Sequence, residues 1–183
     1  MNSHPSPLAA TDLETAIRTR RTHKAYTSRP VDPETLKELF EVARWAPNHH
    51  VTNPWRFRVI GPQTLERLAE EAERDKPGSA QKLRRAPTLV AVTARRDDDD
   101  PDQAREDLLA TGVAAYIVLL AAHARGLAGY WRTVPLLSTP GARSLLAIPD
   151  DEEPVGLLYL GHPIQDQRVP PRAPVEEIAS FLP

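Results

Sequence analysis

The sequence predicts a mixed β-sheet flanked by helices and folded as one domain. Its length, 183 residues, is that of a single domain. Some segments repeat apolar residues at spacings of three and four, and short β-branched or apolar runs alternate with them. The predicted order is helix, helix, strand, helix, strand, long helix, strand, helix, strand. Helices outnumber strands, and packing helices on a sheet buries the apolar faces of both.

The first half of the chain begins with a polar segment, residues 1–10, which we expect to be a flexible tail. A capping-box pattern, Thr11-Asp12-Leu13-Glu14, then begins a helix that should end near Arg20. The Asp32-Pro33 pair begins a second helix, because an acidic cap before proline is typical of a first turn, and Pro47 stops it. The remaining elements of this half are a strand at 56–60 and an amphipathic helix at 63–74.

The second half contains the most apolar strands and the longest helix. Residues 88–94 and 155–160 are mostly apolar or β-branched, as in buried strands. Between them, residues 103–125 have a helical pattern that is apolar on nearly every side, so we expect a central helix buried nearly all round. A short strand at 127–131 and a helix at 140–147 complete this half.

Two segments should lack regular structure. Residues 97–100 are four consecutive aspartates, which repel one another, so we expect an exposed loop, with a calcium site as the alternative. Prolines crowd residues 161–183, which should form an extended arm with at most a short helix at 175–181. Because no linker interrupts the chain, we assign 11–183 to one domain.

Composition excludes several classes of function. The chain has 23 basic and 25 acidic residues, so it lacks the positive field of a nucleic-acid-binding protein. It has no cysteine, which excludes disulfides, thiolate zinc sites and a cysteine nucleophile. Its polar start is unlike a secretory signal, and its longest apolar run, 113–122, is about half a membrane span. We therefore expect a cytoplasmic protein that binds neither membrane nor nucleic acid.

The familiar motifs of hydrolysis and nucleotide binding are missing from the sequence. No serine has the glycine flanks of a nucleophile elbow, and there is no Walker loop and no GxGxxG. His49 and His50 are adjacent, so their side chains would point apart on a regular element, and no HxH or HxxxH spacing occurs. We therefore expect no metal site.

Three segments instead suggest a flat aromatic ligand that carries a phosphate. Basic side chains gather at the end of the first helix, and arginine makes forked, charge-assisted bonds to phosphate. A solvated helix end would explain one or two of these cations but not the whole cluster. The loop 45–57 and the strand end 129–133 add tryptophans, amides and hydroxyls, which are typical of ligand walls. The basic cluster comprises Arg18, Arg20, Arg21, His23 and Lys24.

Taken together, these segments resemble those of the nitroreductase family of flavoproteins, in its small branch. The resemblance covers about residues 11–180, with the matching pieces in the family's order. They are Arg20-Arg21-Thr22, Ala46-Pro47-Asn48-His49, Asn53-Pro54-Trp55-Arg56-Phe57, Gly129-Tyr130-Trp131-Arg132-Thr133, Gly156-Leu157-Leu158-Tyr159-Leu160-Gly161-His162-Pro163 and Pro171-Arg172-Ala173-Pro174.

The resemblance implies an α+β fold that forms an intertwined homodimer with FMN at the interface and an exchanged C-terminal arm. It also implies a redox cycle in which NADPH or NADH reduces FMN. The reduced FMN then passes hydride to a nitroaromatic, quinone or similar aromatic acceptor. The flavin N5 carries the chemistry, so no catalytic side chain is expected. A cation near the flavin N1–C2 carbonyl would stabilise the reduced form, and Arg21 or Arg132 is the candidate.

By position, the resemblance also names the residues expected to bind the cofactor. Arg20, Arg21 and Thr22 would hold the phosphate and the pyrimidine side of FMN. Trp45 and His49 would contact it, often from the second subunit, and Ala121 to Gly126 matches a nicotinamide-nucleotide segment. Asn53 stands where many members have glutamine. The expected cofactor-binding set is Arg20, Arg21, Thr22, Trp45, Asn48, His49, Asn53, Trp131, Arg132, Thr133 and Arg172.

Two alternatives stay open at the level of sequence. A specialised member of the superfamily, such as a dehalogenase or a flavin-modifying enzyme, would keep the same cofactor. A flavin-binding protein without nicotinamide turnover would keep the cofactor and lose the reaction.

Overall fold

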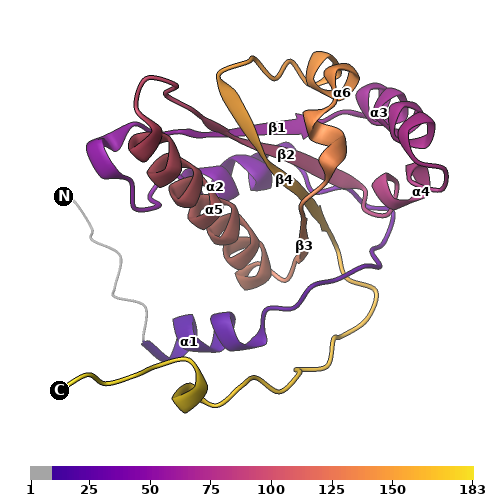
Figure 1. Ribbon diagram of the computed structural model, residues 1–183. Helices are drawn as coiled ribbons and strands as arrows, with labels where there is room; N and C mark the ends of the chain where they lie inside the picture. The colour runs from indigo at the N-terminus through magenta and orange to yellow at the C-terminus, as the bar shows by residue number, and fades with distance from the viewer. Residues whose placement is uncertain (1–9) are drawn as a thin grey trace, which may run out of the picture.

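The computed structural model describes residues 10–183, and their side chains from Leu13 onward. Its centre is a four-stranded sheet with the order β1-β2-β4-β3 (Figure 1). The helices lie on both faces of this sheet. The strands are β1 (Trp55–Ile60), β2 (Thr88–Arg95), β3 (Ala128–Arg132) and β4 (Glu152–Gly161). The α-helices are α1 (Ala10–Thr19), α2 (Pro33–Ala43), α3 (Pro62–Asp75), α4 (Ala80–Leu83), α5 (Pro101–Ala124) and α6 (Pro140–Leu145).

Alternation along the strands gives the domain two cores, one on each face of the sheet. On β4, Leu158 and Leu160 pack with α2 and α5, whereas Leu157 and Tyr159 pack with α3, α4 and α6. Successive strand residues point to opposite faces, so one apolar run serves both cores. All four of these β4 side chains are fully buried. The strand predicted as most apolar is therefore a central one.

Local signals place the helix starts. Asp32 caps α2, with its carboxylate accepting from the Thr35 backbone N–H at 2.8 Å. Asp100, the last residue of the acidic run, caps α5 by accepting from the Gln103 N–H at 3.0 Å. Thr139 caps α6. Each cap satisfies a first-turn donor that the helix itself cannot pair.

Most predicted elements are confirmed within one or two residues. The second helix ends earlier than its proline stop, at Ala43, and the short helix predicted at 175–181 is the 3₁₀ turn Val175–Glu177. The helix α4 was missed, because four residues are too few for a periodic pattern. Of the predicted tail, residues 1–9 lie outside the described residues, and Ala10 begins α1. The run 97–100 is exposed, as predicted.

Two expectations need correction. The sheet was predicted to be mixed, yet all pairings among the four strands are antiparallel. Within residues 10–183, the parallel pairing is a single bridge between Thr22 and Gly129. Apolar patterns report burial and carry no information on strand direction, which the connections decide. The helix α5 is also not buried nearly all round, since Leu109 is 64% exposed and Val113 is 39% exposed.

The helix α5 is long and apolar enough by composition to cross a membrane. In this fold it packs on the sheet and on α2, where Ala114, Val118 and Ala122 are fully buried. The core helix of a globular protein has the same composition as a membrane span. Its apolar character is therefore explained by its position in the core.

A buried ion pair joins three strands at one end of the sheet. The Arg58 guanidinium on β1 meets the Glu152 carboxylate on β4 in a forked contact, at 2.7 and 3.0 Å. The Thr93 hydroxyl on β2 accepts from Arg58 at 2.8 Å and donates to Glu152. The Glu152 side chain is 7% exposed. Burial alone would raise the pKa of Glu152, but the bonds from Arg58 and Thr93 outweigh it and lower that pKa.

Residues 162–183 form an exposed arm. It leaves the end of β4 and runs on the side of the molecule where α1 lies (Figure 1). One bridge, between Tyr26 and Pro163, and one bond from the Thr27 N–H to the His162 carbonyl at 2.9 Å hold its first residues. Ile178, Phe181 and Leu182 are each more than three-quarters exposed. The arm therefore has almost no core of its own.

Candidate functional site

A groove opens where the end of α1 meets α5 and the end of β3, and we call it the β3 groove. It has a volume of about 400 Å³. Two aromatic rings, two threonine hydroxyls, one leucine and one arginine surround it. The lining residues are Arg20, Thr22, Tyr116, Leu119, Trp131 and Thr133. Four of the six are predicted cofactor-binding residues, brought together from segments more than 100 positions apart in the chain.

Backbone contacts to β3 hold the Arg20-Arg21-Thr22 segment at the groove. Thr22 forms the bridge to Gly129, and the His23 N–H donates to the Gly129 carbonyl at 3.2 Å. A Cβ at Gly129 would lie 2.6 Å from Leu119 Cδ2, so a side chain there would force the buried Leu119 side chain of α5 to move. Glycine at 129 therefore lets the helix, the strand and the basic segment meet.

A second glycine makes room for the aromatic wall. Gly156 has φ +150°, and a Cβ there would lie 2.6 Å from Trp131 Nε1 and 2.7 Å from the Arg132 carbonyl oxygen. Trp131 can thus lie against β4, where its Nε1 donates to the Val155 carbonyl at 3.3 Å. On its other side, the indole approaches Gly112 of α5. Contacts with β4 and with α5 therefore hold the Trp131 indole in place as the wall of the groove.

Arg20 supplies the positive charge of the β3 groove. Its guanidinium carbon lies 5.5 Å from the centre of the Tyr116 ring. Its Nε is buried and, among residues 10–183, finds no hydrogen-bond partner. Burial and then the proximity of His123 lower the pKa of His23, and burial and then Arg20 lower that of His123. Both imidazoles are therefore neutral at pH 7, and the charge in this part of the groove is that of Arg20.

Arg21, unlike Arg20, does not line the β3 groove. Its guanidinium donates to the carbonyls of Arg20, at 2.5 Å, and of Arg18. These are carbonyls that the end of α1 leaves unpaired, so Arg21 closes the helix and does not line the groove.

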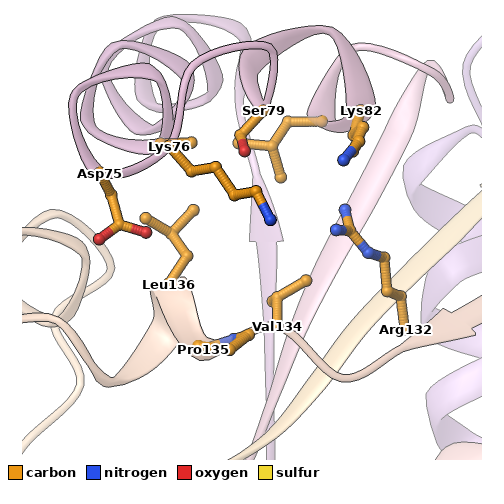
Figure 2. Close-up of a pocket in the computed structure, with 10 residues that line it drawn as sticks. Asp75, Lys76, Ser79, Lys82, Arg132, Val134, Pro135 and Leu136 are labelled. Atoms are coloured by element: carbon orange, nitrogen blue, oxygen red, sulfur yellow. The ribbon is translucent and has the colours of Figure 1, made fainter.

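Arg132 points to the opposite face of the sheet from Trp131 and Thr133, as strand alternation requires. It lines a second cavity, which we call the lysine pocket and which is shown in Figure 2. Lys76 and Ser79 from the turn after α3, together with Lys82 of α4, reach into it opposite an apolar wall. The lining residues are Ala72, Asp75, Lys76, Ser79, Lys82, Leu83, Arg132, Val134, Pro135 and Leu136. Alternate residues of the segment 131–134 line the two cavities, so the lysine pocket and the β3 groove lie on opposite faces of the sheet at the end of the edge strand β3.

Sequence reasoning missed the lysine pocket. Lys76, Ser79 and Lys82 lie between the predicted helix 63–74 and the predicted strand 88–94, and no motif marks them as a site. The Lys76-Pro77-Gly78 sequence was a signal for a tight turn, and Gly78 does have φ +79°. Only the fold shows that this turn faces Arg132.

The loop between α2 and β1 lies away from both the β3 groove and the lysine pocket. Trp45 is 76% exposed, and the His49 ring contacts Glu106 at 2.6 Å. Asp107, buried on α5, accepts from Asn48 and from Thr52 and so anchors the loop. Its 3₁₀ turn η1 (His49–Val51) and the following residues include three left-handed, non-glycine positions: His50, Val51 and Asn53.

This loop and the arm do not line either cavity of the same chain. The α5 positions Asp107, beside the loop, and Tyr116, in the β3 groove, are separated by about 14 Å along the helix axis. Trp45, Asn48, His49 and Asn53 are thus remote from the groove of their own chain. Arg172 lies in the exposed arm. Ala121 and Ala122, in the predicted nicotinamide segment, belong to the core. Within residues 10–183, no three histidines or carboxylates are placed to hold a metal ion.

Comparison with known proteins agrees with this architecture. The NAD(P)H nitroreductase homologue YfhC of Bacillus subtilis is 25% identical over 90% of this chain and 91% of its own. A nitroreductase-like family protein from Bacillus cereus superposes with a TM-score of 0.83 at 25% identity, covering 100% of this chain and 98% of its own.

A third relative was solved with a cofactor. This nitroreductase homologue from Desulfovibrio desulfuricans, in complex with FMN, has a TM-score of 0.74 at 27% identity and covers 98% of this chain and 99% of its own. The family model described as "Nitroreductase family" matches residues 17–162, from the end of α1 through β4. The chain therefore belongs to the nitroreductase family.

Proposed function

We propose that this protein is an FMN-dependent oxidoreductase that uses NADH or NADPH to reduce nitroaromatic, quinone or similar aromatic acceptors. The observation that carries the proposal is the β3 groove, where an arginine with an unpaired, buried Nε faces two aromatic rings and two hydroxyls. The FMN complex of the Desulfovibrio desulfuricans relative supports the same cofactor.

The residues present fit FMN. A buried donor without a partner costs roughly 1–3 kcal/mol, and an anionic ligand that pairs with Arg20 removes this cost. The Thr22 and Thr133 hydroxyls are further donors in the same groove, and Trp131 offers an apolar wall. Bound FMN would supply the hydride-transfer chemistry, and the protein would bind and orient it.

Both cavities are lined by residues of the segment 131–134 at the end of the edge strand β3, and this suggests an orientation for the cofactor around that end. Arg20 and Thr22 would hold the phosphate, and residues 131–134 would lie along the ring system. Arg132 and Lys82, in the lysine pocket, would then donate to the pyrimidine carbonyls. A cation at this edge stabilises the negative charge that the reduced flavin carries. Of the two candidates from the sequence, the position of Arg132 suits this role better than that of Arg21, which is bonded to helix carbonyls.

Reduction by a nicotinamide is the direct test of this function. The purified protein should be yellow or become so with added FMN, bleach with NADPH or NADH under anaerobic conditions, and regain colour with a nitroaromatic. A yellow protein that neither nicotinamide bleaches would favour a flavin-binding role without turnover. A protein that takes up no FMN in fluorescence titration would exclude the whole proposal. Release of halide from a halogenated aromatic, with no nitro reduction, would favour the dehalogenase alternative.

The proposal includes a homodimer in the cytoplasm. Trp45, Asn48, His49 and Asn53 lie too far from the β3 groove of their own chain, so they can contact FMN only from a second copy. Exposed apolar side chains on α5, next to this loop, suit such an interface. The exposed side chains of the arm, Ile178, Phe181 and Leu182, would be buried against the partner subunit.

Light scattering should therefore give twice the chain mass of 20.3 kDa. Leu109→Asp places a charge on the exposed face of α5, where it should be tolerated by the fold but should weaken the dimer and FMN binding together. Circular dichroism would confirm that the helix content is kept. A monomer that holds FMN with undiminished affinity would contradict the proposed interface.

A further inference from the structure

The lysine pocket carries more positive charge than a flavin edge requires. Lys76, Lys82 and Arg132 line it with a single carboxylate, that of Asp75. Within residues 10–183, none of the three cations forms a salt bridge. Three cations and one acid leave a formal charge of +2 on the lining. Such a concentration of unpaired charge around a cavity attracts anions.

Lys76 is the cation left over when the cofactor is placed. In Figure 2 the nitrogen atoms of Arg132 and Lys82 face each other across the pocket, and these two residues are assigned to the flavin carbonyls above. Lys76 enters from the end of α3, with its amine directed into the same space. With Arg132 and Lys82 on the flavin carbonyls as proposed, the Lys76 amine is left to bind another anion in the same pocket.

The backbone holds Lys76 in this position. Its N–H donates to the Ala72 carbonyl and ends α3. The Glu73 carboxylate then accepts from the Gly78 and Ala80 N–H groups, at 2.7 and 3.1 Å, and fixes the turn. These two bonds lower the pKa of Glu73, so it is ionised at neutral pH. Because the turn is fixed, the lysine stem starts from a defined point, and less conformational freedom is lost on binding.

The rest of the pocket suits an aromatic ring. Val134, Pro135 and Leu136 form an apolar wall beneath the lysine. Ala72 and Leu83 also line the pocket. An apolar wall with one cation at its edge matches a planar aromatic compound that carries an anionic group.

We propose that Lys76 makes this protein select aromatic acceptors that carry a carboxylate. The proposal rests on the proposed function, since it names the acceptor class for the same site. Lys76 acts as a specificity-determining residue, because its ammonium pairs with the carboxylate while the ring lies on the apolar wall. The phosphates of a nicotinamide nucleotide are the other anions that could use this amine, and the test separates them.

The test compares 4-nitrobenzoate with 4-nitrobenzamide, which differ chiefly in charge. For the wild type and Lys76→Gln, kcat/KM is measured with both acceptors. The ratio of carboxylate to amide should fall about two- to fivefold in Lys76→Gln, which is the effect of losing one exposed charge pair. Lys76→Arg should keep the ratio. Lys37→Gln, an exposed lysine on α2 paired with Glu34, is the matched control and should keep it too. In the wild type, added salt should reduce the ratio.

Two further measurements make the outcome decisive. Calorimetry with benzoate needs no turnover, and binding should be about two- to fivefold weaker in Lys76→Gln than in the wild type and Lys37→Gln. Equal benzoate affinity and an unchanged acceptor ratio in Lys76→Gln would overturn the proposal. So would a rise in the KM for NADPH alone, because the lysine would then serve the nucleotide. Failure of the proposed function is distinct from these results, since neither the amide nor a nicotinamide would then react even in the wild type.

Discussion

Glu152→Gln is expected to lower the free energy of unfolding by about 3–5 kcal/mol at pH 7, the range for breaking a buried ion pair from one side. Arg58 would keep its charge among β1, β2 and β4 but lose its carboxylate partner. Thr93 would also lose the oxygen to which it donates. Urea unfolding followed by circular dichroism measures the change, with an unchanged slope as the sign that the unfolded state is the same.

The effect should depend on pH in a defined direction. The pKa of Glu152 is lower in the folded protein than in the unfolded chain, so its contribution is complete above the unfolded value. The contribution is lost as the pH falls through the folded value. The wild type should therefore lose stability in acid relative to Glu152→Gln, and the two unfolding curves should approach each other.

An exposed pair provides the control. Glu34 forms an ion pair with Lys37 on α2 at 2.8 Å, but its side chain is 77% exposed. Glu34→Gln makes the same chemical change and should cost less than about 1 kcal/mol, because water and salt screen exposed pairs. Equal losses for the two variants would show that the burial of the Arg58–Glu152 pair has no consequence for stability.

Arg20→Ala is expected to weaken FMN binding by roughly 30- to 150-fold, which corresponds to about 2–3 kcal/mol for a lost charge-assisted contact. Arg20 is the charged residue of the β3 groove, and its buried Nε is unpaired among residues 10–183. Fluorescence titration with FMN measures the affinity. Riboflavin, which lacks the phosphate, should lose little affinity, so the preference for FMN over riboflavin should nearly disappear.

Arg18→Ala serves as the comparison for this experiment. Arg18 lies two residues earlier, in the last turn of α1; its side chain is 78% exposed and has a weak contact to Glu14 at 3.8 Å. Its removal takes away one positive charge near the groove without touching the lining, so FMN affinity should change less than threefold or so. If Arg20→Ala weakened riboflavin and FMN equally, the arginine would support the groove structure and would not bind the phosphate.

Much of the fold could be predicted from local signals. The caps at Asp32 and Thr139 and the apolar runs of β2 and β4 act over a few residues, so they could be found without the structure. The direction of the strands could not, because it depends on how connections cross the sheet. The exposed side of α5 was missed for a related reason: the sequence shows that a residue is apolar, but not whether this chain or a second copy covers it.

The candidate site divides in the same way. The residues at Arg20, Thr22, Trp131 and Thr133 could be named from their types and order, and the structure brings these four together in the β3 groove. Arg21 and Arg132 were grouped with them because they match the same family segments. The structure separates them, since Arg21 bonds to helix carbonyls and Arg132 lies on the other face of the sheet.

The sequence by itself determined the elements, their caps and the chemical types gathered for a flat anionic ligand, because these follow from residue chemistry and short-range spacing. The tertiary structure alone decided which side chains share a cavity. It set Lys76 and Lys82 opposite Arg132, across more than 45 positions of chain, and left the loop at His49 remote from its own groove. Strand alternation and helix packing decide such pairings, and both act between segments that are distant in sequence.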